Sequence, residues 1–159
     1  MRLSERLTFV PLFEPKDTAG SAYVSDAVDL GKFNAFTAYI TFGAITGNSV
    51  LTVYSDATAA LATALTTAIA FKYRFGAADY KAALADTLGD ATTVAATGLT
   101  LTAATFDHRV VIIEIDSDTL GSAGHWVAFN ITSTANPCLV ASVGIGIGRY
   151  GAHTQTTTI

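Results

Sequence analysis

The side chains most capable of chemistry in this sequence form one acidic group, which consists of Glu114, Asp116 and Asp118. Glu114 and Asp116 are two residues apart in a run with strand character, so their carboxylates would share one face of a strand, and Asp118 would follow at the turn. Three such oxygen donors could contribute to a calcium site, which takes about six to eight oxygen ligands. The group could also be the solvated end of a strand that enters a loop, and the sequence leaves both interpretations open.

The histidines and the cysteine do not form a recognisable site. His108, His125 and His153 lack the HxH, HExxH and HxxxH spacings that place two metal ligands side by side. Cys138 lies in an apolar run, where a buried structural thiol is expected. A GxSxG nucleophile elbow and a Walker phosphate loop are absent from the sequence. We therefore expect a non-enzymatic protein with no catalytic residues, no cofactor and no assigned metal site.

A run near the C-terminus alternates glycine with larger residues. Gly144, Gly146 and Gly148 resemble the start of a GxGxxG fingerprint, but they alternate along a strand and do not open a helix, so a phosphate site is not expected. Glycines along one face of a strand more often allow another chain or sheet to approach closely. In the whole run, one set of alternating positions consists of Val140, Ser142 and the three glycines. The other set is predicted to face the core and consists of Leu139, Ala141, Val143, Ile145 and Ile147.

Alternation with a period of two dominates the chain and predicts an all-β fold. In residues 36–42 and 71–75, one set of alternating positions is apolar and is predicted to face the core. Residues 109–116 are apolar on both faces at their centre, which predicts a central strand with both faces covered. Turn-forming residues separate the candidate strands, which lie near 7–13, 21–28, 34–43, 49–55, 68–75, 92–102, 108–116, 125–133 and 138–149.

One stretch has helix potential. Residues 56–68 are rich in alanine and leucine, and Asp56 is placed as a possible N-cap, but the threonines leave a long loop with a helical turn as an open alternative. Residues 76–90 form a second long excursion. About eight antiparallel strands with such excursions predict a jelly-roll or related Greek-key β-sandwich with little helix.

The length of 159 residues fits one domain. Residues 1–16 mix charged and apolar side chains, which predicts a first strand or an N-terminal arm that adds to the edge of a partner's sheet. Residues 17–150 would form the β-sandwich domain. Residues 151–159 are rich in threonine and are expected to form a surface C-terminal tail.

The charge of the chain narrows the classes of partner. Only 14% of the residues are charged, against about 25% in a typical globular protein, which indicates a threonine-covered β surface or a protein packed against neighbours. The net charge of −4 and the lack of a Lys/Arg cluster argue against direct nucleic-acid binding. The sequence has no signal-peptide pattern and no run of about 18 apolar residues, so we expect no membrane partner and synthesis in a reducing cytoplasm.

Five segments, spread over most of residues 22–150, have a recognisable pattern, and they are 22–34 (AYVSDAVDLGKFN), 70–75 (AFKYRF), 86–89 (DTLG), 111–116 (VIIEID) and 141–150 (ASVGIGIGRY). These segments resemble small virion proteins of tailed bacteriophages, in particular the head decoration, or cement, proteins. Proteins of this kind are β-rich, often jelly rolls and often trimers. They bind the outside of the capsid and hold neighbouring major capsid subunits together.

The resemblance implies a virion structural protein on the capsid exterior, made in the cytoplasm of the host bacterium. Its expected partners are the major capsid protein and further copies of itself in a homotrimer. Leu7, Phe9 and Phe13 are the candidate partner-binding residues, because interface energy concentrates in a few apolar or aromatic side chains. The alternative is a phage tail, head-fibre or host-attachment (carbohydrate-binding) β-sandwich module. An enzyme on the same scaffold would need a placed pair of carboxylates, which the sequence does not identify.

Overall fold

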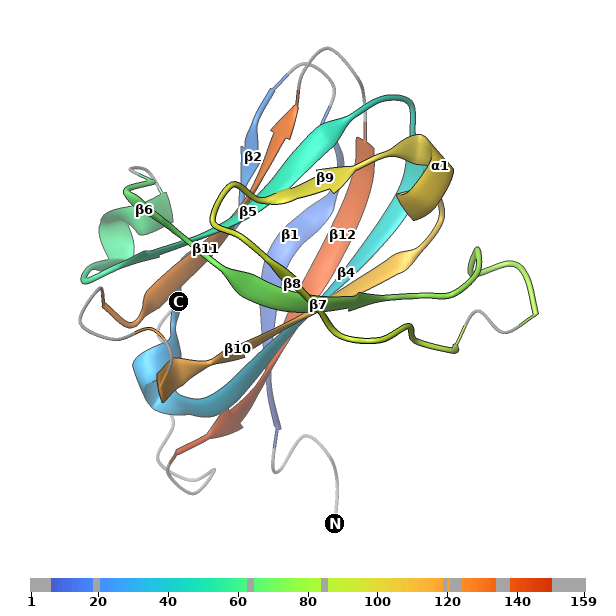
Figure 1. Cartoon of the computed structure of the whole chain (residues 1–159). Coiled ribbons are helices and arrows are strands. Elements are labelled where there is room, and N and C mark those ends of the chain that lie inside the picture. Colours follow the sequence, from blue (N-terminus) through green and yellow to red (C-terminus); the bar gives the residue numbers. More distant parts are fainter. Residues whose placement is uncertain are drawn as a thin grey trace.

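The computed structural model describes residues 7–18, 21–62, 65–83, 86–118, 120, 124–133 and 138–149. The fold is an all-β sandwich of two antiparallel sheets (Figure 1). Sheet A contains, in spatial order, β1 (Leu7–Asp17), β12 (Cys138–Gly148), β4 (Phe33–Ile45), β10 (Val110–Asp116), β7 (Phe71–Phe75) and β8 (Thr92–Val94). Sheet B contains β2 (Tyr23–Val24), β11 (Trp126–Ser133), β5 (Ser49–Asp56) and β6 (Thr67–Ile69), with β3 (Val28–Asp29) also paired to β11 and β9 (Leu99–Leu101) to β5.

The order in which the chain visits the two sheets is that of a jelly roll. From the N-terminus it enters sheet A with β1, sheet B with β2 and β3, sheet A with β4, and sheet B with β5 and β6. The strands β7 and β8 then extend the end of sheet A before β9 returns to sheet B. It then alternates again, with β10 in sheet A, β11 in sheet B and β12 in sheet A. Two sheets linked in this way form the double Greek key that defines the jelly roll, so the predicted fold class is confirmed.

The structure describes twelve strands where the sequence predicts nine candidate ranges, because three of the predicted strands are each divided. The predicted strand at 21–28 forms β2 and β3. The strand at 68–75 crosses from sheet B to sheet A at Ala70 and forms β6 and β7. The strand at 92–102 becomes β8 in sheet A and β9 in sheet B. An apolar, β-prone run does not reveal where the chain leaves one sheet for the other, because both sheets accept the same residue types.

The helix potential of residues 56–68 is realised only as one 3-10 turn, η3 (Ala59–Ala62), in the described part of that stretch. The Asp56 side chain accepts hydrogen bonds from the backbone N–H of Thr58 and from the hydroxyl of Thr66. These bonds draw the two ends of the loop together and end the excursion at β6. The loop alternative is therefore the correct one. The α-helix that the structure describes is α1 (Ala103–Phe106), a single turn between β9 and β10.

The core lies between the two sheets. The inner face of β4 contributes Phe36, Ala38, Ile40 and Phe42, as the alternation predicts, and all four are buried. The prediction that both faces of residues 109–116 are covered is wrong. β10 is central in sheet A, but Glu114 and Asp116 on its outer face are exposed, while Val111, Ile113 and Ile115 on its inner face are buried.

The two faces of β12 are the reverse of the prediction. Gly144 and Gly146 are buried against the core, whereas Ile147, on the opposite face, is 51% exposed. A Cβ atom on Gly144 would lie 2.2 Å from the Phe36 ring, and one on Gly146 would lie 2.3 Å from the Phe33 ring. The two aromatic rings, which lie on the adjacent strand β4, fill the space that side chains of β12 would need. The close approach to the glycines, which was expected from another chain or sheet, is made by the Phe33 and Phe36 rings of the same sheet. The larger residues of β12 therefore point outward.

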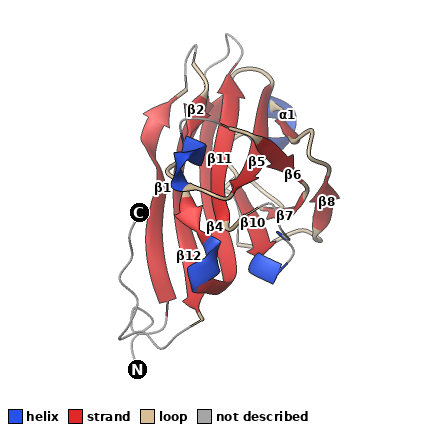
Figure 2. Ribbon diagram, turned by 90° about the vertical axis from the view of Figure 1, so that its left-hand side faces the viewer, coloured by secondary structure: helices blue, strands red, loops and turns tan. Residues whose placement is uncertain are grey.

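β1, β12 and β4 lie side by side and are long strands of 11, 11 and 13 residues (Figure 2). β1 pairs with β12 from Leu7 to Asp17, so the described part of the N-terminal segment is an integral strand at one end of sheet A. Residues 1–6 and the predicted tail at 151–159 lie outside the described residues.

Candidate functional site

The outer face of sheet A is divided into an apolar half and a charged half. Paired residues of antiparallel strands project to the same side of a sheet, so the strand register defines rows across that face. One row consists of Phe9, Ile145, Thr37, Glu114, Lys72 and Thr93. The next consists of Pro11, Val143, Tyr39, Ile112 and Arg74. A third consists of Leu7, Ile147, Ala35 and Asp116. In each row the side chains are apolar on β1 and β12, and charged residues first occur on β10 or β7.

The apolar half is a continuous surface, which we call the apolar outer face. Its members are Leu7, Phe9, Pro11, Tyr39, Ile112, Val143, Ile145 and Ile147. Phe9 is 50% exposed, Ile147 51% and Tyr39 39%. A single exposed apolar side chain is common on any protein, but neighbouring ones on several adjacent strands are typical of an interaction surface.

The three partner-binding candidates have different positions. Leu7 and Phe9 belong to the apolar outer face, Leu7 half-buried and Phe9 largely exposed. Phe13 is only 2% exposed and packs in the core, with its ring centre 4.9 Å from that of Tyr23. The register between β1 and β12 shifts on both sides of Phe13, and this irregularity turns its side chain inward. Phe13 is therefore removed from the surface candidates, while binding through Leu7 and Phe9 stays a prediction.

The residues that sequence reasoning missed are the aliphatic side chains of β12 and Ile112 of β10. Val143, Ile145 and Ile147 were predicted to face the core because they are large and alternate with glycine. The signal that would have placed them outside is the aromatic pair Phe33 and Phe36, which needs the glycine positions for its rings. That signal becomes readable only once β4 and β12 are known to be neighbours.

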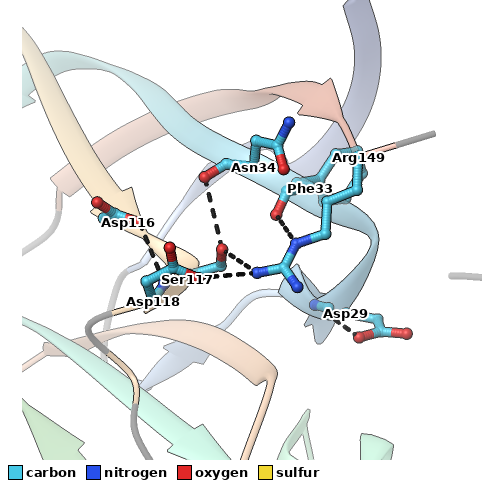
Figure 3. Close-up of polar contacts among 8 residues, drawn as sticks. Asp29, Phe33, Asn34, Asp116, Ser117, Asp118 and Arg149 are labelled. Carbon is cyan, nitrogen blue, oxygen red and sulfur yellow. Dashed lines mark hydrogen bonds and ion pairs between the residues drawn. The ribbon is translucent and has the colours of Figure 1, made fainter. Parts of the chain in front are cut away.

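Asp116 and Asp118 of the acidic group are held at the end of β10 by contacts within the protein (Figure 3). A carboxylate oxygen of Asp116 accepts a hydrogen bond from the backbone N–H of Asp118, and Asp118 forms an ion pair of 3.1 Å with Arg149. The Arg149 guanidinium also donates to the Ser117 hydroxyl and to the Phe33 carbonyl. Among the described residues, no three His, Cys, Asp or Glu side chains are arranged to hold a metal ion. The contacts present are those of a strand end tied to the end of β12.

Beside this end of β10, a pocket of about 540 Å³ opens in the charged half of sheet A. Its walls come from the crossover between β6 and β7, from β8 and β10, and from the turn after β10. The lining residues are Ile69, Ala70, Phe71, Lys72, Thr93, Glu114, Ile115, Asp116 and Leu120. The pocket thus combines buried apolar residues with one cationic, one hydroxyl and two carboxylate side chains.

Cys138, the histidines and Trp126 lie in different surroundings. Cys138 is fully buried, as predicted, and burial raises the pKa of its thiol to about 12, so the thiol stays protonated at neutral pH. His108 has a positive φ of 53°, and its Nδ1 atom lies 3.0 Å from the Tyr80 hydroxyl. His125 is exposed, and His153 lies outside the described residues. Trp126 is half-buried in a small cluster on the outer side of sheet B.

The chain resembles two solved structures at low sequence identity. The crystal structure of the SPBc2 prophage-derived protein YomS is similar, with a TM-score of 0.45 and 14% identity, over 88% of this chain and 93% of that chain. A structure of infectious bursal disease virus, Gt strain, is similar with a TM-score of 0.26 and 11% identity, over 96% of this chain and 42% of that chain. No protein-family model and no curated protein matches the sequence.

In the part of the chain that the structure describes, no helix has the length and hydrophobicity needed to span a membrane.

Proposed function

We propose that this chain is a non-enzymatic structural protein of a bacteriophage virion, which binds the outside of the capsid and stabilises contacts between major capsid subunits. The apolar outer face of sheet A is the single observation that carries the proposal. The sequence resemblance to head decoration proteins supplies the class of partner, and the jelly-roll topology is compatible with it. The surface that such a partner would cover is the apolar outer face, which is formed by side chains of β1, β12, β4 and β10.

The chemistry of the apolar outer face suits a protein partner. Burial of exposed apolar area is the dominant favourable term in most protein–protein association. Phe9 and Ile147 lie on neighbouring strands and are each about half exposed, so both can lose further area to a partner. Large binding energies concentrate in a few well-packed side chains near the centre of such a surface, and aromatic residues are frequent among them. A capsid subunit that covers this face would bury Phe9, Ile147 and Tyr39 together.

A homotrimer is the second part of the proposal. A trimer places the same surface in three equivalent positions, which matches the symmetry of a three-fold axis of a capsid. Light scattering at low micromolar concentration measures the mass in solution. A stable trimer is expected, and a monomer over the whole concentration range would contradict this part of the proposal without affecting the face that binds the capsid.

The experiment that tests the capsid interface is co-sedimentation with undecorated heads assembled from the major capsid protein of the same phage. The double variant Phe9→Ser/Ile147→Ser is expected to lose binding by about a hundredfold or more, because each side chain contributes at the level of an interface hot spot. Leu88→Ser is the matched control, since Leu88 is also 41% exposed but lies away from sheet A's apolar half, in the bridge to Gly76. Unchanged binding by the double variant, with an unchanged unfolding transition, would exclude the apolar outer face as the interface.

A further inference from the structure

The pocket in the charged half of sheet A has the construction of a small-molecule site. It lies where the chain crosses from sheet B to sheet A at Ala70, between β6 and β7. Phe71, Ile115 and Leu120 are 4%, 5% and 6% exposed, so they form an apolar floor that belongs to the core. The volume of about 540 Å³ is within the range of about 300–1,000 Å³ that small-molecule sites occupy.

The polar side chains of the pocket form an ordered set on one side of this floor. Thr93, Lys72 and Glu114 are consecutive members of one cross-strand row, so their Cβ atoms are about 5 Å apart from one strand to the next. Asp116 follows Glu114 on the same face of β10, about 7 Å along the strand. A ligand on the floor would therefore meet a hydroxyl, an ammonium group and two carboxylates in sequence.

The mixture of charges restricts the chemical class of the ligand. A simple anion would be repelled by the net negative charge of Glu114, Asp116 and Lys72, and a simple cation bound to the carboxylates would offer the Lys72 ammonium group no acceptor. A carboxylate only accepts hydrogen bonds and an ammonium group only donates them, whereas a hydroxyl does both. A ligand with several neighbouring hydroxyls can therefore satisfy all of these groups without carrying a charge. Its carbon-bound face must also be apolar enough to lie on Phe71, Ile115 and Leu120.

We propose that this pocket binds a neutral saccharide. Glu114 and Asp116 accept hydrogen bonds from sugar hydroxyls, Lys72 donates one, and the C–H face of the ring lies on the apolar floor. This function goes beyond capsid binding and does not depend on it, because the pocket lies across β7, β8 and β10 and shares no residue with the apolar outer face. A virion protein with both surfaces could hold a capsid with one half of sheet A and a glycan with the other.

The test is a titration of the full chain, observed by ¹H–¹⁵N NMR, with glucose, galactose, mannose, N-acetylglucosamine and their disaccharides at millimolar concentrations. At least one sugar is expected to shift the amides of residues 69–72, 93 and 114–116 in a saturable manner. Glu114→Gln and Lys72→Met should each weaken that binding by about tenfold, because a charge-assisted hydrogen bond is lost in each. Glu14→Gln, an exposed position on β1 outside the pocket, should leave it unchanged.

Three results would overturn the proposal. The first is the absence of saturable shifts with every sugar on the panel. The second is equal sugar affinity in Glu114→Gln and in the Glu14→Gln control. The third is saturation of the same amides by acetate or ethylammonium alone, which would make the pocket a site for a simple ion. Each of these results leaves the head co-sedimentation of the wild-type chain unaffected, so failure of the saccharide site and failure of capsid binding are distinguishable.

Discussion

Sheet A and sheet B share one core, but their outer faces differ in what covers them. On sheet B, Ala128 of β11 points away from the core and is nevertheless 0% exposed. Val24, Tyr54, Leu65 and Trp126 pack around it as a second, smaller cluster. Asn130, the next residue on that face, is also buried. The outer side of sheet B is thus closed by side chains of the same chain.

The outer face of sheet A has no comparable cover among the described residues, and Phe9, Tyr39 and Ile147 are exposed there. The difference arises from the excursions. The segment between β5 and β6 supplies Leu65 to sheet B, and the segment around β2 supplies Val24 and Ala27. The hydrophobic effect favours burial of exposed apolar surface. A partner protein would therefore bury more apolar area on the outer face of sheet A than on that of sheet B.

The largest expected effect tests whether the outer face of sheet A is separate from the core. Phe9 and Phe13 are on the same strand, but Phe13 is 2% exposed and Phe9 is 50% exposed. Phe13→Ala is expected to lower the free energy of unfolding by about 3–5 kcal/mol. Phe9→Ala should change it by about 0.5 kcal/mol or less. Urea unfolding of both variants measures the difference. A large loss of unfolding free energy in Phe9→Ala would mean that other parts of the free chain already cover the outer face of sheet A. The outer faces of the two sheets would then not differ as described.

A smaller effect compares the two outer faces directly through one alanine on each. Ala128 lies beneath the cluster on sheet B, whereas Ala35 is exposed on the outer face of sheet A. Ala128→Leu inserts three carbon atoms into a filled space and should cost about 1–3 kcal/mol of unfolding free energy. Ala35→Leu should stay within about 0.5 kcal/mol of the wild type. Thermal unfolding of the pair gives the comparison, and equal losses at the two positions would show that sheet B is not specially covered.

The smallest effect is a pH dependence of the loop between β5 and β6, which supplies Leu65 to the cluster on the outer side of sheet B. The hydrogen bonds from Thr66 and Thr58 lower the pKa of Asp56 below its ordinary value of 3.8. Because the pKa is lower in the folded state, the stabilisation is fully present above about pH 4 and is lost as the pH falls through the lowered pKa. Trp126 is paired with Asp56 across β11 and β5, so its fluorescence should report loosening of this loop on acidification.

Asp56→Asn removes the titrating group, and the acid transition in Trp126 fluorescence should disappear in this variant. Asp90→Asn is the matched control, because Asp90 is exposed and lies in a different loop. An acid transition that persists in Asp56→Asn but is lost in Asp90→Asn would assign the effect to another part of the molecule and remove the pH argument from sheet B.

Much of the fold was predictable because it depends on local patterns. The period of two along β4, from Phe36 to Phe42, identifies the strand and its inner face at once. Turn residues divide the chain into segments that match the jelly-roll strands. The division of 68–75 at Ala70 was not predictable, since a crossover between two sheets needs no special residue type.

The candidate surface was predictable only in part. Leu7 and Phe9 stand in a segment of mixed polarity, which predicts a first strand or an arm but does not separate their orientations from that of Phe13. The pocket combines residues from four separate segments, and their proximity follows from strand pairing that no local pattern contains.

The sequence by itself determined that this protein is a β-sandwich, because hydrophobic alternation and turn chemistry act over a few residues. The tertiary structure alone decided which side of β12 faces water. Two large rings, Phe33 and Phe36, lie more than a hundred residues before Gly144 and Gly146 and occupy the space above them. Since two atoms cannot share one volume, the glycines turn inward, and Val143, Ile145 and Ile147 are left on the face available to a partner.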